Sequence, residues 1–177
     1  MRAPGLTFLV GGARSGKSRL ALRLAIASGR PVAVIATGAP GDDEMAERIR
    51  RHRAERPPSW TTIEEPRDLE AALAKVGADT TVIVDCLTLW VANLLGQDLT
   101  DDEIETRASA AAGLAAGHAG GAVVVSNEVG MGVVPANALA RRYADLLGRV
   151  NATWAGTADR AFLVVAGRAL RLDAIDG

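Results

Sequence analysis

The stretch GGARSGKS, residues 11–18, decides the fold of this 177-residue chain. It follows a short apolar run at 6–10 and precedes residues with helical spacing. The pattern G-x-x-x-x-G-K-[ST] therefore stands in the strand–loop–helix context of a phosphate-binding loop, or P-loop. The glycines let backbone N–H groups wrap around phosphates, and the helix adds the positive end of its dipole. We expect Lys17 to contact the β- and γ-phosphates and the Ser18 hydroxyl to bind Mg²⁺.

Short apolar runs separated by helical patterns continue along the rest of the chain. Runs at 32–36, 81–85, 122–126 and 161–166 resemble the first one and suit strands of a parallel sheet covered on both faces. Helices are expected at 17–28, 42–55, 67–76, 87–95, 100–117 and 137–157, and edge strands at 60–63 and 168–172. Alternating strands and helices predict right-handed crossovers. The expected fold is α/β, with a P-loop NTPase-type, mostly parallel sheet and helices on both faces.

Composition narrows the class of protein further. The length suits one domain spanning 1–177, and no repeat or linker divides it. A net charge of -1 argues against a general nucleic-acid binder, which needs a basic surplus. The single cysteine, Cys86, excludes an internal disulfide and fits a reducing compartment. No apolar run reaches the roughly 18 residues of a membrane span. We therefore expect a cytoplasmic protein.

Asp85 ends the apolar run at 81–85, the pattern of a Walker B strand. In P-loop proteins such an aspartate sits beside the first strand and binds Mg²⁺. The alternative is a turn aspartate that caps the helix beginning near Leu87. We favour the metal role.

The segment 42–56 begins acidic and ends basic, as a helix dipole favours, so a solvated surface helix is one interpretation. Two features oppose it. Met45, Ile49 and His52 share one face of the expected helix. Five arginines also surround His52, and neighbouring cations disfavour the charged imidazole. A neutral imidazole is a nucleophile, and the arginines could hold a phosphate before it. His118, the other histidine, is expected to cap the helix at 100–117.

Together these motifs resemble one family in order and over nearly the whole chain. They are GGARSGKS, IATG at 35–38, DDEMAERIRRHRAERP at 42–57, VDCLTLWVANLL at 84–95, VSNEVGMGVVP at 125–135 and RRYADLLGRVN at 141–151. They resemble the bifunctional adenosylcobinamide kinase / adenosylcobinamide-phosphate guanylyltransferase of cobalamin biosynthesis.

The resemblance implies a two-step enzyme. ATP or GTP phosphorylates the hydroxyl of the aminopropanol arm of adenosylcobinamide. A histidine then attacks GTP, releases pyrophosphate and carries GMP, which passes to adenosylcobinamide phosphate to give adenosylcobinamide-GDP. The resemblance also implies a homo-oligomer, with a corrinoid as its small-molecule partner.

By position, the resemblance makes His52 the guanylylated residue, because the first histidine of the family's usual pair is Arg51 here. Many members have Glu where this chain has Asp85. Lys17 is the second expected catalytic residue, and Ser18 and Asp85 are the expected Mg²⁺ ligands. The expected nucleotide-binding residues are Gly11, Gly12, Ala13, Arg14, Ser15, Gly16, Lys17, Ser18, Arg19, Ala36, Thr37, Gly38, Arg53, Ala54, Glu55, Arg56, Glu64 and Asp85.

Three other functions stay open. A simple P-loop small-molecule kinase would have no covalent intermediate, and His52 would be a salt-bridged surface residue. A regulatory GTPase is disfavoured because the chain has no N-K-x-D motif. A non-catalytic nucleotide-binding module is disfavoured because Lys17, Ser18 and Asp85 are intact. The glycine-containing loop at 127–132 either meets the corrinoid or forms a structural turn.

Overall fold

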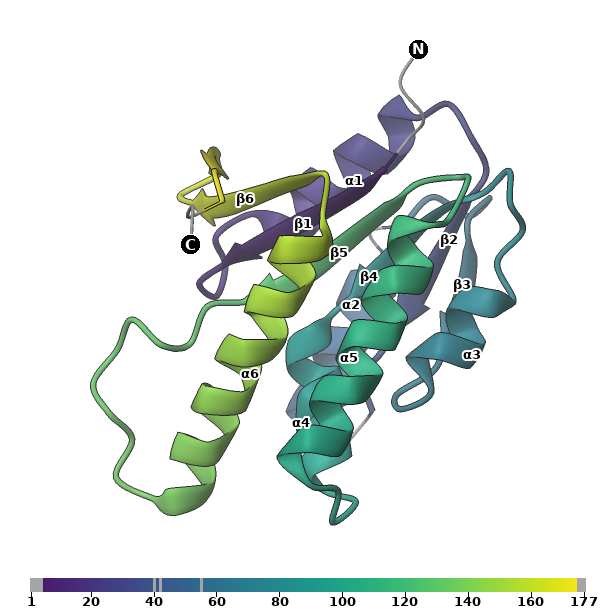
Figure 1. Ribbon diagram of the computed structural model, residues 1–177. Coiled ribbons are helices and arrows are strands. Elements are labelled where there is room, and N and C mark those ends of the chain that lie inside the picture. Colours follow the sequence, from purple (N-terminus) through teal and green to yellow (C-terminus); the bar gives the residue numbers. More distant parts are fainter. Residues whose placement is uncertain (1–4, 40, 42, 55, 175–177) are drawn as a thin grey trace.

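The computed structural model describes residues 5–39, 41, 43–54 and 56–174 (Figure 1). Its elements in chain order are β1 (Leu6–Gly11), α1 (Lys17–Ala27), β2 (Val32–Ala36), α2 (Asp43–Ala54), β3 (Thr61–Glu64), α3 (Leu69–Ala74), β4 (Thr81–Asp85), α4 (Leu87–Leu95), α5 (Asp101–Ala116), β5 (Ala122–Asn127), α6 (Ala138–Thr157), β6 (Arg160–Val165) and β7 (Arg168–Leu172). The strands and helices alternate as expected, and most boundaries agree within two residues.

The strands form one sheet in the order β3-β2-β4-β5-β1-β6-β7. The first six are parallel to their neighbours, and β7 returns antiparallel to β6. The predicted α/β fold with a mostly parallel sheet is confirmed. Because parallel strands end at the same edge, the segments after β1, β2, β4 and β5 all emerge at one edge of the sheet.

Side chains that alternate along the strands divide the core between the two faces of the sheet. In β1, Phe8 and Val10 join the larger cluster, which α3, α4, α5 and α6 cover and whose largest buried side chains are Trp90 and Trp154. Leu9 faces the other way, into the cluster covered by Ala21 and Ala25 of α1. Figure 1 shows α5 and α6 in front of the sheet and α1 behind it.

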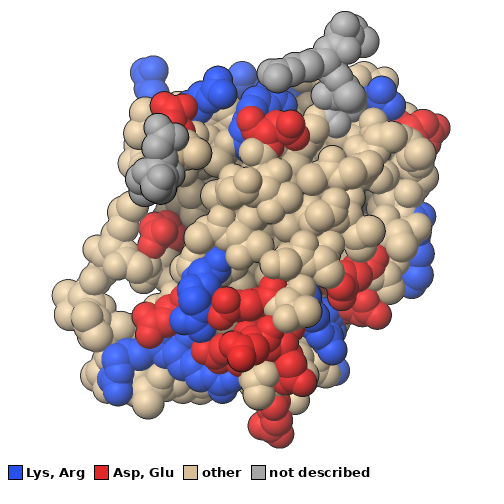
Figure 2. Space-filling view, viewed as in Figure 1, with Lys and Arg blue, Asp and Glu red and all other residues tan. Residues whose placement is uncertain are grey.

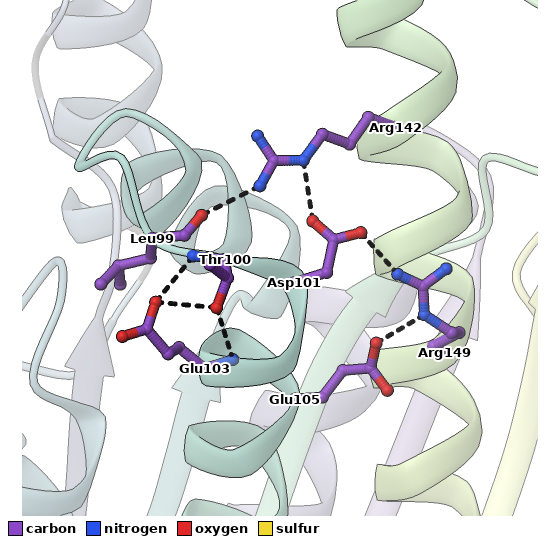
Figure 3. Close-up of polar contacts among 7 residues, drawn as sticks. All are labelled: Leu99, Thr100, Asp101, Glu103, Glu105, Arg142 and Arg149. Atoms are coloured by element: carbon purple, nitrogen blue, oxygen red, sulfur yellow. Dashed lines mark hydrogen bonds and ion pairs between the residues drawn. The ribbon is translucent and has the colours of Figure 1, made fainter.

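An ion-pair network joins α5 to α6 on the larger face (Figure 3). The Asp101 carboxylate accepts hydrogen bonds from Arg142 and from Arg149, each at 2.7 Å. Arg149 also donates to Glu105 at 2.6 Å. Figure 2 shows these charges gathered at one end of the face, beside a broad uncharged area. The network joins the N-terminal end of α5 to Arg142 near the start of α6 and to Arg149 in its middle.

Local signals set the ends of the helices. Thr100 and Glu103 form a capping box at the start of α5, since each side chain accepts a hydrogen bond from the backbone N–H of the other residue. Helix α3 begins two residues later than expected because Asp68 caps it through the N–H of Ala71. The prediction for His118 is wrong. Its ring lies 2.7 Å from the carbonyl oxygen of Thr80, in the turn before β4, and Gly117 ends α5.

None of the helices in the described part of the chain is long and apolar enough to span a membrane.

Candidate active site

The P-loop joins the end of β1 to the start of α1, as the sequence predicts. The structure requires glycine at two positions of this loop. A Cβ on Gly11 would lie 2.2 Å from the carbonyl oxygen of Val164, so no larger residue fits there. Gly16 has a φ of 103°, a conformation that L side chains rarely adopt. The tip, Gly12 to Arg14, is exposed, whereas Ser15 and Lys17 are buried.

The Lys17 ammonium lies inside the loop. Its Nζ donates to the carbonyl oxygens of Gly11 and Gly12, both at 2.7 Å, and lies 3.4 Å from the Ser15 hydroxyl. Only 6% of the residue is exposed. The buried charge is therefore held at the beginning of the loop, where it can attract the phosphates of a nucleotide.

A small hollow beside the start of α1 brings Ser18 together with Asp85 and Arg56. Its apolar walls come from Ala21, Leu22, Val34 and Ile83. Both expected Mg²⁺ ligands thus line one hollow. One detail of the expectation is wrong, however. β5 lies between β4 and β1, so Asp85 does not sit beside the first strand. The crossover through α4 and α5 inserts β5 there.

Arg53 and Arg56 reach the same edge of the sheet from the end of α2. The ends of three strands are in register there, with Ala36 opposite both Glu64 and Asp85. Arg53 forms an exposed ion pair with Glu64 at 3.0 Å. Burial lowers the pKa of Arg56; the charge of Arg53 acts in the same direction, while Asp85 and Glu64 oppose it. Two expected nucleotide-binding arginines therefore face two expected carboxylates.

Thr37 is an expected nucleotide contact, but its polar groups form hydrogen bonds within the protein. It is fully buried, and its hydroxyl donates to the carbonyl of Cys86 at 2.6 Å and accepts from the Cys86 N–H at 2.8 Å. Its backbone N–H donates to the Asp85 carbonyl, and its own carbonyl accepts from Asn93. The polar groups of Thr37 therefore hold the junction of β4 and α4. The adjacent Ala36 and Gly38 are partly exposed.

The structure describes the remaining expected residues only in part. Glu55 lies outside the described residues. His52 belongs to α2, but its side chain is also outside the described part of the chain. Ala54 and Arg19 are exposed. The expectations for His52 and Glu55 thus remain predictions.

Two contacts to the loop come from residues that the sequence analysis did not select. The N–H of Gly167, in the turn between β6 and β7, donates to the carbonyl of Ser15 at 2.8 Å. The N–H of Glu128, directly after β5, donates to the carbonyl of Gly11 at 3.1 Å. No local sequence pattern predicts the contact of Gly167 with Ser15. The second falls in the VSNEVGMGVVP motif, whose loop at 127–132 was expected to contact the corrinoid or to form a structural turn.

The strand order, the loop between β1 and α1 and the neighbouring hollow define a P-loop nucleotide-binding protein of the α/β class. Solved structures agree with this fold. A RadB recombinase superposes with a TM-score of 0.52 at 18% identity, covering 91% of this chain and 74% of that one. The ATP synthase subunit NeqB from Nanoarcheaum equitans gives 0.56 at 13% identity, covering 91% and 45%.

Sequence comparison then gives the family. The model described as cobinamide kinase / cobinamide phosphate guanyltransferase matches residues 7–172, and the chain belongs to this family. The bifunctional adenosylcobalamin biosynthesis protein CobP of Pseudomonas aeruginosa is 46% identical over 162 residues, or 90% of this chain and 92% of that protein. The CobU proteins of Salmonella typhimurium and Escherichia coli are each 39% identical, over 94% of this chain and 99% of theirs. The resemblance stated from the motifs is confirmed.

Proposed function

We propose that this chain performs both reactions of its family within one domain spanning 1–177. It phosphorylates cobinamide with a nucleoside triphosphate and then transfers GMP from GTP to the cobinamide phosphate. The observation that carries the proposal is the loop at 11–18, in which Lys17 is buried against two loop carbonyls beside the hollow of Ser18 and Asp85. Such a loop is built to hold a triphosphate.

Catalysis of both displacements at phosphorus consists mainly of positioning and charge neutralisation. In the kinase step, Lys17 and the backbone N–H groups of the loop would bind the β- and γ-phosphates. Arg56 lines the same hollow and can contact a phosphate oxygen; a charge-assisted hydrogen bond of this kind contributes about 1.5–3 kcal/mol. Arg14 and Arg19, two further expected contacts, are exposed and accessible to a nucleotide.

Mg²⁺ fits the residues that line the hollow. Ser18 and Asp85 both offer oxygen atoms, the ligands that this ion prefers. The residues that the structure describes contain no cluster of three or more His, Cys, Asp or Glu side chains suited to a metal. Two protein oxygens suit an ion that arrives with the nucleotide and keeps phosphate and water ligands. When bound, Mg²⁺ would neutralise charge on the phosphates.

In the second step we propose His52 as the residue that carries GMP. It lies on α2, two residues before Ala54 at the end of that helix, and the following Arg56 reaches the hollow beside the P-loop. The imidazole would form a bond to the α-phosphorus of GTP while pyrophosphate leaves. The phosphate of cobinamide phosphate would then displace the imidazole. Splitting one transfer into two in this way lowers each barrier.

The main alternative is a kinase without a covalent intermediate, and one experiment separates the two. The purified protein is incubated with Mg²⁺ and GTP labelled at the α-phosphate, then denatured and tested for bound label. We expect an acid-labile, base-stable GMP adduct that His52→Ala abolishes. His118→Ala is the matched control and should keep the adduct, since that ring contacts Thr80. Intact GTP binding without an adduct would leave the plain kinase as the better account.

We further propose a cytoplasmic homo-oligomer with adenosylcobinamide as its corrinoid substrate. The lone cysteine is compatible with a reducing compartment. A corrinoid is large relative to a chain of 177 residues, so a site completed between subunits would suit it. Sedimentation analysis with and without the corrinoid tests the oligomer.

A further inference from the structure

The kinase reaction needs a group that takes the proton of the substrate hydroxyl, and the residues considered so far do not supply it. Four carboxylates stand at or just after the strand ends of this edge: Glu64, Glu65, Asp85 and Glu128. The Glu65 carboxylate accepts hydrogen bonds from the N–H groups of Arg67 and Asp68, in the turn before α3. Glu64 is paired with Arg53, and Asp85 lines the proposed Mg²⁺ hollow. Cys86, directly after Asp85, packs against the smaller core cluster on the α1 face of the sheet. Glu128 is the carboxylate not yet used.

The backbone places Glu128 against the loop that would hold the triphosphate. β5 pairs in parallel with β1, and Asn127 stands opposite Gly11 in the register. One step further, the Glu128 N–H donates to the Gly11 carbonyl oxygen at 3.1 Å. The Lys17 ammonium donates to that same oxygen atom at 2.7 Å. The N–H of Glu128 and the ammonium expected to contact the γ-phosphate therefore share one acceptor atom.

Hydrogen bonds to two helices hold the end of β5, directly before Glu128, in place. The Asn127 N–H donates to the Thr88 hydroxyl at 2.8 Å, and the Asn127 carbonyl accepts from Asn151 of α6 at 3.0 Å. Both sides of the last β5 residue are thus anchored to helices on the larger face. A general base needs such a fixed origin, because small displacements weaken proton transfer strongly.

Beyond Glu128 the edge is open. The side chain itself is half-buried and accepts a hydrogen bond from the Gly130 N–H. The following segment loops away from the body (Figure 1), with Met131, Val133 and Val134 between 75% and 96% exposed. A large substrate can therefore approach the carboxylate from this side, while the nucleotide lies on the loop.

We propose that Glu128 is the catalytic base of the kinase step. The substrate hydroxyl oxygen forms a bond to the γ-phosphorus as the bond from that phosphorus to the β–γ bridging oxygen breaks. The nucleoside diphosphate leaves with that oxygen. The hydroxyl proton passes to the Glu128 carboxylate and afterwards to water. This inference rests on the proposed function, since it requires the triphosphate in the P-loop.

Glu128→Gln separates this role from a purely structural one. The amide oxygen of Gln can still accept the hydrogen bond from Gly130, but the amide cannot take the proton. The two half-reactions are measured separately, with cobinamide and ATP for the first and with prepared cobinamide phosphate and GTP for the second. We expect the kinase kcat to fall roughly 10²–10⁴-fold, the usual contribution of a general base. The guanylyl transfer and the KM for ATP should stay within twofold.

Glu65→Gln is the matched control. Glu65 also follows a strand end and also accepts from backbone N–H groups, those of Arg67 and Asp68. It should leave both half-reactions unchanged. An unchanged kinase kcat in Glu128→Gln would overturn the proposal, and so would equal losses in both half-reactions, because those indicate a role in shaping the loop. Wild-type protein that binds ATP but phosphorylates nothing would instead refute the proposed function itself.

Discussion

The N–H of Gly167 donates to the carbonyl of Ser15 at 2.8 Å and so orients one peptide group of the P-loop. The peptide between Ser15 and Gly16 is planar and trans, so its carbonyl and its N–H point in opposite directions. Holding the Ser15 carbonyl against the β6–β7 turn therefore directs the Gly16 N–H away from that turn, toward the side where we propose that phosphate binds. The turn acts as a brace for the phosphate site.

Substitution of Gly167 should test this brace. Gly167 has a φ of 75°, which a β-branched residue adopts only with strain and Asn tolerates far better. A Cβ there meets only the end of the Arg19 side chain, at 3.3 Å. We expect Gly167→Val to weaken GTP binding roughly 5- to 30-fold, as 1–2 kcal/mol of strain implies, and Gly167→Asn to bind nearly normally.

Calorimetric titration with Mg²⁺ and GTP measures this difference, and thermal unfolding without nucleotide monitors the stability of both variants. Equal GTP affinity in the two variants, with Gly167→Val still folded, would show that the loop keeps its shape without the brace.

Asp85→Asn should make nucleotide binding insensitive to magnesium. The neutral amide is a poorer ligand for a hard cation, so the affinity for GTP should fall about 10-fold or more when Mg²⁺ is present. In EDTA the affinity should stay level or rise, because the negative charge of Asp85 faces Arg56 in the wild type. Titrations under the two conditions check this. A loss of the same size in EDTA would exclude a metal role.

The ionised Asp101 carboxylate should stabilise the folded protein at neutral pH and lose this effect in acid. The hydrogen bond from Arg142, and then Arg149, lowers the pKa of its carboxyl below the usual 3.8, against a cost of desolvation. The unfolded chain thus binds a proton there more readily, so this stabilisation is present above about pH 4 and is lost as pH falls through the lowered folded-state value.

We expect Asp101→Asn to reduce the free energy of unfolding at pH 7 by a few tenths to about 1 kcal/mol, since the network is partly exposed. The difference should narrow below pH 3.8. Asp102→Asn changes the same helix turn without this network and should have a smaller effect. Urea unfolding of both variants at several pH values provides the measurement, and a difference for Asp101→Asn that stays constant down to pH 2 would contradict the assignment.

Cys86 should react slowly with thiol reagents in the folded protein. Burial, followed by the nearby Asp85 charge, raises the pKa of its thiol from 9.0 to about 11. The thiolate is the reactive form, so at pH 8 the modification rate should be about 100-fold below that of the unfolded chain. Because Cys86 is the only cysteine, the measured rate of thiol modification belongs to Cys86 alone. Equal rates in folded and urea-unfolded protein would show that the thiol is accessible.

The sequence predicts correctly those structural features that depend on interactions between residues close together in the chain. The buried strands, the capping box at Thr100 and the context of the P-loop all follow from patterns within a few residues. Strand order does not, because it depends on where long crossovers return. This is why β5 rather than β4 lies beside β1. The buried hydroxyl of Thr37 illustrates the same limit, since its partner Cys86 is 49 residues away in the sequence.

The same limit applies to the candidate site. Lys17 and Ser18 could be selected from one motif, whereas Glu128 and Gly167 become significant only when the fold brings them to Gly11 and Ser15. A Glu within a glycine-containing loop carries no distinctive spacing, and neither does a Gly in a two-residue hairpin turn. Contacts through the backbone leave little trace in side-chain patterns.

The interior position of β1 in the sheet has a consequence for the order in which the chain can fold during synthesis. Its two neighbours, β5 and β6, begin at residues 122 and 160, so a nascent chain of about 120 residues has its first strand without either hydrogen-bonding partner. Pairing across such separations is slow and leaves strand edges exposed to aggregation. Ribosome-bound chains that end before residue 160 should therefore depend on chaperones, and the phosphate site, braced by Gly167, should be completed only when the last strands emerge.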